Sequence, residues 1–209
     1  MKTLVIGANG QIGRQFCELA SRGGMSLRAM IRHSDQQPWF HERGIDTVIG
    51  DLEGDFHQAF NGCDQVVFSA GSGPHTGPDK TLLIDLYGAI RAVDLAVERG
   101  LERFLMVSAL RASDPMAAPA KLRPYMAAKF AADAYLRCAR IPHVILKPGK
   151  LTDAPASRLV SAAAAHADGI EVSRGNVAYA LLHLSQARML KNREFDLLDG
   201  DSSIAMALL

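Results

Sequence analysis

The stretch Thr3-Leu-Val-Ile-Gly-Ala-Asn-Gly-Gln-Ile-Gly13 places three glycines between a short apolar run and an amphipathic segment. The apolar run at 4–6 is typical of a buried strand, and Gly7 permits a sharp turn because it lacks a Cβ. Gly10 removes side-chain bulk where main-chain amides can meet a phosphate, and Gly13 allows a following helix to pack closely on the sheet. The stretch therefore predicts a phosphate-binding turn of the dinucleotide type, spaced G-x-x-G-x-x-G instead of G-x-G-x-x-G.

The helix that follows this turn is expected over Gln11–Arg22. Free N–H groups and the positive end of the helix dipole make such an N-terminus a binding site for anions. A pyrophosphate is expected to contact the turn and the first helical residues, which are Gly7, Asn9, Gly10, Gln11, Ile12 and Gly13. A glycine-rich turn without a ligand is the alternative at this point.

The chain has 209 residues and 48% apolar content, so it is long enough to bury a full core. We expect a single domain over 1–209, in which residues 150–190 contribute a small substrate-side region. The 23 basic and 22 acidic residues are interspersed and leave a net charge of +1. This balance argues against a nucleic-acid partner, which requires a concentrated positive surface.

The three cysteines, Cys17, Cys63 and Cys138, lie far apart and lack C-x-x-C spacing. We expect them to be reduced core residues, with neither a disulfide framework nor a metal site. The N-terminal apolar run lacks a signal-peptide layout, and no stretch approaches about eighteen consecutive apolar residues. These features predict a soluble, cytoplasmic protein without a membrane partner.

Short apolar runs rich in β-branched residues recur along the chain, as is typical of parallel strands buried on both faces. They are Leu27–Ile31, Ile45–Ile49, Val66–Phe68, Phe104–Val107 and Val144–Leu146. Helical segments separate them, and the longest runs over Asp79–Arg99 and stops before Gly100. The alternation predicts an α/β fold with a doubly wound parallel sheet of the Rossmann type. Towards the C-terminus it loosens into an alanine-rich piece near 162–165, a helix near Asn176–Arg188 and a last strand at Glu194–Leu198.

The residue that follows the second strand indicates which cofactor is preferred, because it lies beside the adenosine 2′ position in this fold. Here that residue is Arg32, whose guanidinium cannot accept from a ribose hydroxyl but pairs strongly with a 2′-phosphate. NADP (NADPH) is therefore favoured over NAD, although Asp35 weakens the preference slightly and a solvated surface arginine is the alternative. Asp51 follows the third strand and is expected at the adenine amino group, with a helix N-cap as the other interpretation.

Tyr125-Met-Ala-Ala-Lys129 places a phenol and an ammonium on one helical face, about 6 Å apart along the axis. Free tyrosine titrates at about pH 10, so proton exchange at neutral pH needs a stabilised phenolate, and Lys129 has the required charge. Lys129 can also hold the nicotinamide ribose hydroxyls. Ser108 follows an apolar strand at the sheet edge where such folds bind ligands, so its hydroxyl is expected to hold a carbonyl oxygen. A surface tyrosine beside a solvated lysine is the alternative.

These residues resemble the short-chain dehydrogenase/reductase superfamily, specifically its compact atypical branch of NAD(P)-binding, NmrA-like and epimerase-like proteins. The resemblance covers most of the chain and rests on Gly7–Gly13, Asp51–Leu52, Ser69–Gly71, Val107–Ala109, Tyr125–Lys129 and Lys147–Gly149. It implies that Ser108, Tyr125 and Lys129 interconvert a carbonyl and an alcohol. It also implies cofactor contacts from the ends of the third, fourth and sixth strands, namely Asp51, Leu52, Ser69, Ala70, Gly71 and Pro148.

Two departures from the family pattern bear on the function. Asp85 stands where many members have an asparagine that organises a proton-relay water, so the relay is in doubt and a solvated or subunit-facing aspartate is equally consistent. The large C-terminal substrate domain of sugar-nucleotide epimerases is also missing, which favours a small substrate.

Three functions therefore remain open: a reductase or dehydrogenase, an NmrA-like sensor of NADP(H) without catalysis, and an epimerase-like enzyme that keeps its cofactor. The glycine-rich loop 71–78 is expected either to close over the nicotinamide or to be a plain connection, and His75 either to reach substrate or to be solvated. The chain is expected to be a monomer or a homodimer joined by its two long middle helices.

Overall fold

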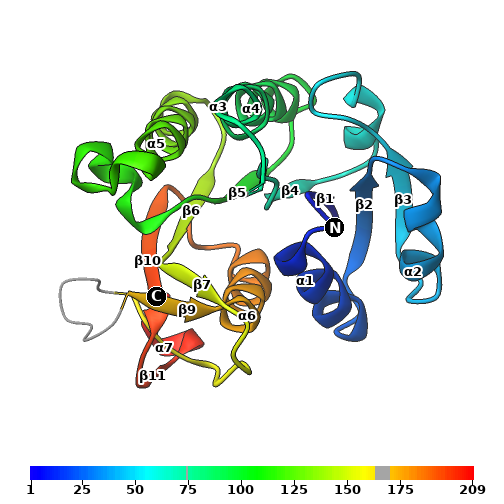
Figure 1. Cartoon of the computed structure of the whole chain (residues 1–209). Coiled ribbons are helices and arrows are strands. Elements are labelled where there is room, and N and C mark those ends of the chain that lie inside the picture. The colour runs from blue at the N-terminus through cyan, green and yellow to red at the C-terminus, as the bar shows by residue number, and fades with distance from the viewer. Residues whose placement is uncertain (74, 163–169) are drawn as a thin grey trace.

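The computed structural model describes residues 1–73, 75–162 and 170–209, and most of the alanine-rich piece expected near 162–165 lies outside them (Figure 1). Its centre is a nine-stranded sheet of order β11-β8-β10-β6-β5-β4-β1-β2-β3. The parallel strands are β1 (Lys2–Ile6), β2 (Ser26–Ile31), β3 (Asp46–Ile49), β4 (Gln65–Phe68), β5 (Arg103–Val107), β6 (His143–Pro148) and β10 (Arg193–Asp199). The expected doubly wound α/β fold is confirmed, because parallel strands follow each other through helical crossovers.

The C-terminal part adds strands that the sequence pattern did not predict. β8 (Leu159–Ser161) pairs antiparallel with both β10 and β11 (Ser202–Ser203), so the sheet is mostly and not wholly parallel. β7 (Lys150–Thr152) and β9 (Glu171–Ser173) form a separate parallel pair. These strands have two or three residues, too few to show an apolar pattern of their own.

Helices cover both faces of the sheet (Figure 1). α1 (Gln11–Arg22) and α6 (Arg174–Gln186) pack together on one face, and α4 (Ala89–Glu98) and α5 (Arg123–Cys138) lie on the other. The alternation of side chains along β1 divides its residues between the two cores: Val5 packs on the first face, and Leu4 and Ile6 pack on the second. The short helices are η1 (Ser34–Gln36), α2 (Gln37–His41), η2 (His57–Phe60), η4 (Leu110–Ser113), η5 (Pro115–Ala117), η6 (Ala120–Leu122) and α7 (Ile204–Ala207).

The helix expected over Asp79–Arg99 is composed of α3 (Pro78–Lys80), a π-helical stretch η3 (Thr81–Gly88), and α4. A π-helix has more residues per turn than an α-helix, so apolar residues spaced for an α-helix do not all face the core. Leu82 and Leu83 are accordingly exposed, and Asp85 is buried in their place. The sequence predicted a helix here but not the π-helical stretch, which exposes Leu82 and Leu83 and buries Asp85.

Two further expectations about burial are wrong. The run Ile45–Ile49 forms the edge strand β3, and Ile49 is 50% exposed, because no strand covers its outer side in the described sheet. Cys17 and Cys63 are buried thiols as expected, but Cys138 is exposed at the end of α5. Burial raises the pKa of Cys17 to about 12.

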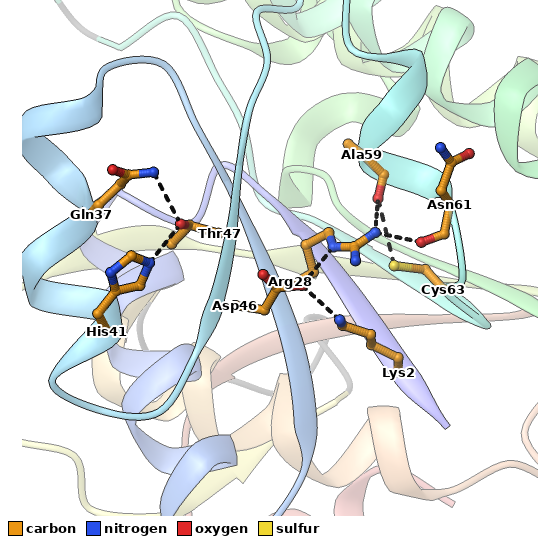
Figure 2. Close-up of polar contacts among 9 residues, drawn as sticks. All are labelled: Lys2, Arg28, Gln37, His41, Asp46, Thr47, Ala59, Asn61 and Cys63. Atoms are coloured by element: carbon orange, nitrogen blue, oxygen red, sulfur yellow. Dashed lines mark hydrogen bonds and ion pairs between the residues drawn. The ribbon is translucent and has the colours of Figure 1, made fainter.

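A polar cluster ties the amino ends of the first strands together, at the opposite end of β1 from the glycine turn (Figure 2). The carboxylate of Asp46 accepts from Lys2 Nζ at 2.6 Å and from Arg28 Nε at 2.9 Å. Arg28 also donates to the carbonyls of Ala59 and Asn61. Although partial burial opposes the shift, Lys2 and Arg28 hold the pKa of Asp46 below its ordinary value. The cluster joins β1, β2, β3 and the loop after η2, and its role is structural.

A second ionic cluster joins β10, α5 and β6. Glu194 accepts from Arg137 Nη2 at 3.0 Å and contacts the Lys147 ammonium. The pKa of Glu194 is lowered from 4.5 to about 2. The hydrogen bond from Arg137 is the largest cause, and the hydrogen bond and charge of Lys147 add to it, while partial burial acts in the opposite direction. In the described residues, no helix is long and apolar enough to cross a membrane.

Glu194→Gln is expected to destabilise the fold in a pH-dependent way. A carboxyl whose folded pKa is lowered stabilises the protein above its unfolded pKa of 4.5, and the stabilisation disappears as the pH falls towards 2. After allowance for solvent screening, we expect a loss of about 1–2 kcal/mol at pH 7 by chemical denaturation. The difference from wild type should narrow below about pH 4.5. The control Glu171→Gln removes an exposed ion pair with Lys150 and should change the free energy of unfolding little. If Glu194→Gln is equally destabilised at pH 7 and at pH 3, the ion pairs of Glu194 are not the source of its stabilising effect.

Candidate functional site

The glycine turn is held by main-chain contacts that exclude any side chain. Gly7 has φ +86°, and a Cβ there would lie 2.5 Å from the amide nitrogen of Ala70 at the end of β4. A Cβ on Gly13 would lie 2.2 Å from the carbonyl oxygen of Gly7. Gly10 is different, because a Cβ there meets only the Gly7 carbonyl at 3.3 Å and is otherwise open. Gly7 and Gly13 therefore shape the turn, and Gly10 leaves its outer side free for close approach.

The N-terminus of α1 fits a diphosphate. Its first N–H groups have no intrahelical acceptor, its N-cap Gly10 makes no side-chain cap, and its first turn holds no acidic residue. The Asn9 side chain, expected at the phosphate, accepts instead from Arg14 at 2.9 Å (Nε) and 2.6 Å (Nη2). The main-chain amides and the helix dipole are thus available to an anion.

A cavity of about 530 Å³ opens at the carboxyl ends of the parallel strands. It joins residues that the sequence analysis assigned separately to the cofactor and to catalysis. Those on its walls are Gly10, Gln11, Ile12, Ser69, Ala70, Gly71, Ser108, Tyr125, Lys129 and Pro148. The carboxyl edge of an open α/β sheet is where such folds bind their ligands.

Six predicted residues lie outside this cavity. Gly7, Asn9 and Gly13 belong to the frame of the turn, described above. Arg32 follows β2 and is exposed, and in the described part of the chain its guanidinium has no polar partner. Asp51 follows β3, is exposed, and accepts the Glu53 N–H at 3.0 Å, so it caps a turn and not a helix. The Leu52 side chain is buried in the core near Gly88 and does not face the cavity.

Ser108 and Lys129 both lie at the end of β5, and each is held by a different partner. Lys129 is 1% exposed, and its ammonium donates to the Val107 carbonyl at 2.7 Å. The interpretation of a solvated lysine is therefore wrong. Ser108 is 3% exposed, and its hydroxyl donates to Asp133 Oδ2 at 2.6 Å. Burial lowers the pKa of Lys129, while the Asp85 and Asp133 carboxylates oppose that change.

Tyr125 lies on the cavity wall in the first turn of α5, as the sequence predicted. The sequence predicted that Lys129 lowers the pKa of Tyr125. Burial instead raises the pKa of the Tyr125 phenol, and the carboxylates of Asp85 and Asp133 raise it further. In this structure the pKa of Tyr125 is therefore shifted upwards, opposite to the lowering expected from Lys129.

Asp85 anchors the loop that follows β4. It is 1% exposed, and its Oδ2 accepts the N–H of Ser72 at 3.0 Å. A Cβ on Gly71 would lie 3.0 Å from the other carboxylate oxygen, so a glycine there permits the contact. The interpretations of Asp85 as solvated or subunit-facing are both wrong. His75 is exposed and is not on the cavity wall, whereas Ser72, Gly73, Thr76 and Gly77 are.

Sequence reasoning missed four polar residues at or near this site: Arg14, Lys121, Asp133 and Arg174. Lys121 and Arg174 line the cavity, and Arg174 donates to Asp153 at 2.7 Å. Asp133 lies four residues after Lys129 and eight after Tyr125, so the same helical spacing would have found it. Arg174 gave no comparable signal, because contacts between distant segments bring it to the cavity.

The sheet order, the glycine turn and a cavity at the carboxyl edge define an α/β protein of the dinucleotide-binding class. Residues 7–187 match the model of a family described as NAD(P)H-binding, and the chain belongs to this family. The resemblance to compact NAD(P)-binding, epimerase-like proteins is thereby confirmed.

Relatives extend over the whole chain. It is 41% identical over 212 residues to YhfK of Bacillus subtilis (strain 168), named an uncharacterised sugar epimerase, with 100% of this chain and 99% of the relative covered. It is 36% identical over 160 residues to UPF0659 protein YMR090W of Saccharomyces cerevisiae, covering 72% and 70%. A solved structure from Bacillus halodurans, a candidate NAD-dependent epimerase/dehydratase, has a TM-score of 0.94 at 39% identity and covers 99% and 97%.

Alanine at Gly10 and at Gly13 should separate cofactor binding from folding. Gly13→Ala forces a Cβ into the Gly7 carbonyl and is expected to cost about 1–3 kcal/mol of stability, seen as a lower Tm. Gly10→Ala meets only the Gly7 carbonyl, at 3.3 Å, and needs a small shift there, but it blocks the approach of the phosphate. Its Tm should therefore fall much less than that of Gly13→Ala, while NADPH affinity falls about tenfold or more by calorimetry. Normal NADPH affinity in folded Gly10→Ala protein would show that the diphosphate does not bind at this turn.

Proposed function

We propose that this chain is an NADP-dependent oxidoreductase that interconverts a small carbonyl compound and its alcohol. The observation that carries the proposal is the single cavity whose wall includes the glycine turn, the end of β4, and the side chains of Ser108, Tyr125 and Lys129. A binding fold alone does not establish chemistry, but the Tyr125 phenol and the buried Lys129 ammonium on the wall of the same cavity supply acid–base groups that binding does not need.

In the proposed mechanism, the bound nicotinamide cofactor supplies or accepts the hydride. Tyr125 gives a proton to the developing alkoxide and takes it back when the alcohol is oxidised. Ser108 orients the substrate oxygen at the end of β5. Lys129, fixed by the Val107 carbonyl, places a positive charge at the base of the cavity and holds the cofactor ribose hydroxyls.

The preference for NADP over NAD rests on Arg32. Its exposed guanidinium follows β2, beside the place where the adenosine 2′ position lies in this fold, and in the described structure it has no competing carboxylate. Gly10, Gln11 and Ile12 would hold the diphosphate through their main chain, and Ser69, Ala70, Gly71 and Pro148 would line the ribose and nicotinamide. Asp51 remains our candidate for the adenine amino group.

Arg32→Ala should weaken NADPH binding far more than NADH binding. The loss of one charge-assisted contact to the 2′-phosphate is expected to cost about 1.5–3 kcal/mol, or roughly ten- to a hundredfold in Kd, measured by calorimetry. Arg22→Ala is the matched control, because Arg22 lies at the C-terminal end of α1, away from the glycine turn, and pairs with Glu18. This variant should leave both affinities unchanged. Equal losses of NADPH and NADH affinity would reject the assignment of Arg32.

Tyr125→Phe should abolish turnover and leave NADPH affinity within a few fold. The assay is NADPH oxidation against a panel of aldehydes, ketones and quinones, run with the wild type first to find a substrate. Tyr135→Phe is the control, because Tyr135 lies on the same helix but bonds Asp94 away from the cavity. Turnover retained by Tyr125→Phe would remove this phenol as the acid.

An epimerase-like reaction is the second candidate, favoured by the names of the Bacillus subtilis and Bacillus halodurans relatives. The nicotinamide would then accept a hydride from the substrate and return it, Ser108, Tyr125 and Lys129 would keep the roles given above, and the cofactor would stay bound through each cycle. The two reactions differ in cofactor use: the oxidoreductase consumes NADPH in proportion to product, and the epimerase retains the cofactor through purification and consumes none. A cofactor sensor would need no phenol beside an ammonium.

A further inference from the structure

Three ionisable side chains follow one face of α5 at intervals of four residues: Tyr125, Lys129 and Asp133. The first two line the cavity. Asp133 lies one turn further along, behind the wall, and is 1% exposed. Its contact with the cavity is therefore indirect and runs through the Ser108 hydroxyl, which does line the cavity.

The direction of the bond between Ser108 and Asp133 decides what Ser108 offers a substrate. A serine hydroxyl has one proton to donate, and here it donates that proton to Asp133 Oδ2 at 2.6 Å. The side of Ser108 Oγ that faces the cavity then carries only lone pairs. In this state Ser108 accepts a hydrogen bond from an alcohol, and it has no proton left to give to a carbonyl oxygen.

The surroundings of Asp133 allow the bond to reverse. Its second oxygen, Oδ1, is buried and has no hydrogen-bond partner among the described residues. Burial raises the pKa of Asp133, while the Ser108 hydrogen bond and the charges of Lys129 and Arg137 from α5 and Lys147 from β6 lower it. Once Asp133 takes a proton from solvent, it can donate to Ser108 Oγ and free the serine proton for the cavity.

We propose that Asp133 is a positioning residue that sets the direction of the Ser108 hydroxyl, and through it whether the site receives an alcohol or a carbonyl compound. This inference rests on the proposed oxidoreductase function. Ionised Asp133 makes Ser108 an acceptor and favours the alcohol; protonated Asp133 makes Ser108 a donor and favours the carbonyl. The proton that reverses the bond exchanges between Asp133 and solvent and does not enter the balance of the reaction, in which the cofactor supplies the hydride and Tyr125 the proton.

The bond itself can be tested without any substrate. In protein labelled with ¹³C at the aspartate carboxyls, the Asp133 resonance is assigned by its absence in Asp133→Asn and titrated with pH. Removal of the stabilising donor in Ser108→Ala should raise the midpoint of Asp133 by about one pH unit. Ser108→Thr keeps a hydroxyl and should titrate like wild type. A midpoint that is the same in Ser108→Ala and wild type overturns the proposal.

The effect on the reaction is tested with 4-nitrobenzaldehyde and 4-nitrobenzyl alcohol as a matched pair of probes. In wild type, kcat/KM for NADPH-dependent reduction of the aldehyde should fall about tenfold per pH unit above the Asp133 midpoint, and oxidation of the alcohol should rise through the same range. Asp133→Asn has no titrating proton and should lose this dependence. Asp94→Asn, on α4 and bonded to Tyr135, is the control and should keep it.

The two possible failures are distinguishable. A wild-type profile that Asp133→Asn reproduces overturns the role of Asp133 and leaves the oxidoreductase intact. Failure of wild type to reduce any carbonyl compound removes the proposed function, and the carboxyl titration still decides whether Asp133 sets the Ser108 hydroxyl. Circular dichroism and Tm confirm that each variant is folded before it is compared.

Discussion

The close approach of Gly13 to the Gly7 carbonyl is the constraint on which the site depends. With no Cβ at either position, α1 starts directly against the end of β1, and the turn touches the main chain of Ala70 at the end of β4. This contact starts α1 at the carboxyl edge of the sheet, so that Gly10, Gln11 and Ile12 lie on the cavity wall together with Ser69 and Ala70 from the end of β4. Even one added methyl group would separate these elements, because main-chain atoms cannot move aside as a flexible side chain can.

The opposite wall of the cavity depends on a single helix. α5 carries Tyr125, Lys129 and Asp133 at intervals of four residues, and Lys129 is bonded to the last carbonyl of β5. That bond holds the helix at a fixed height along the strand, so Tyr125 reaches the cavity and Asp133 reaches Ser108. The four-residue spacing on α5 and the end of β5 are therefore sufficient to bring Tyr125, Lys129 and Ser108 to one cavity.

Features encoded within one segment could be predicted from the sequence. Local patterns predicted the glycine turn, the bounds of α1 and the strands from β2 to β6. They also predicted that Tyr125 and Lys129 share one face of a helix. The burial of Asp85 depends on a π-helical stretch and on Ser72 from a different loop, which no local pattern specifies. Arg174 reaches the cavity through the packing of α6 on α1, a long-range arrangement. The pKa of Tyr125 is likewise raised by its burial in the folded chain and by the carboxylates of Asp85 and Asp133, none of which the local Tyr–Lys spacing specifies.

Burial of Asp85, Lys129 and Asp133 at and behind the cavity wall costs free energy, and a hydrogen bond from or to each group offsets part of that cost. The partners are the Ser72 N–H, the Val107 carbonyl and the Ser108 hydroxyl, and all three lie where the chain leaves β4 or β5. The ionisable groups therefore hold the loops that form the walls, and those loops in turn keep the groups out of water. Replacement of one of them by alanine would remove a charge and a wall contact together. Amide and hydroxyl replacements that keep the shape are consequently the variants that separate chemistry from folding at this site.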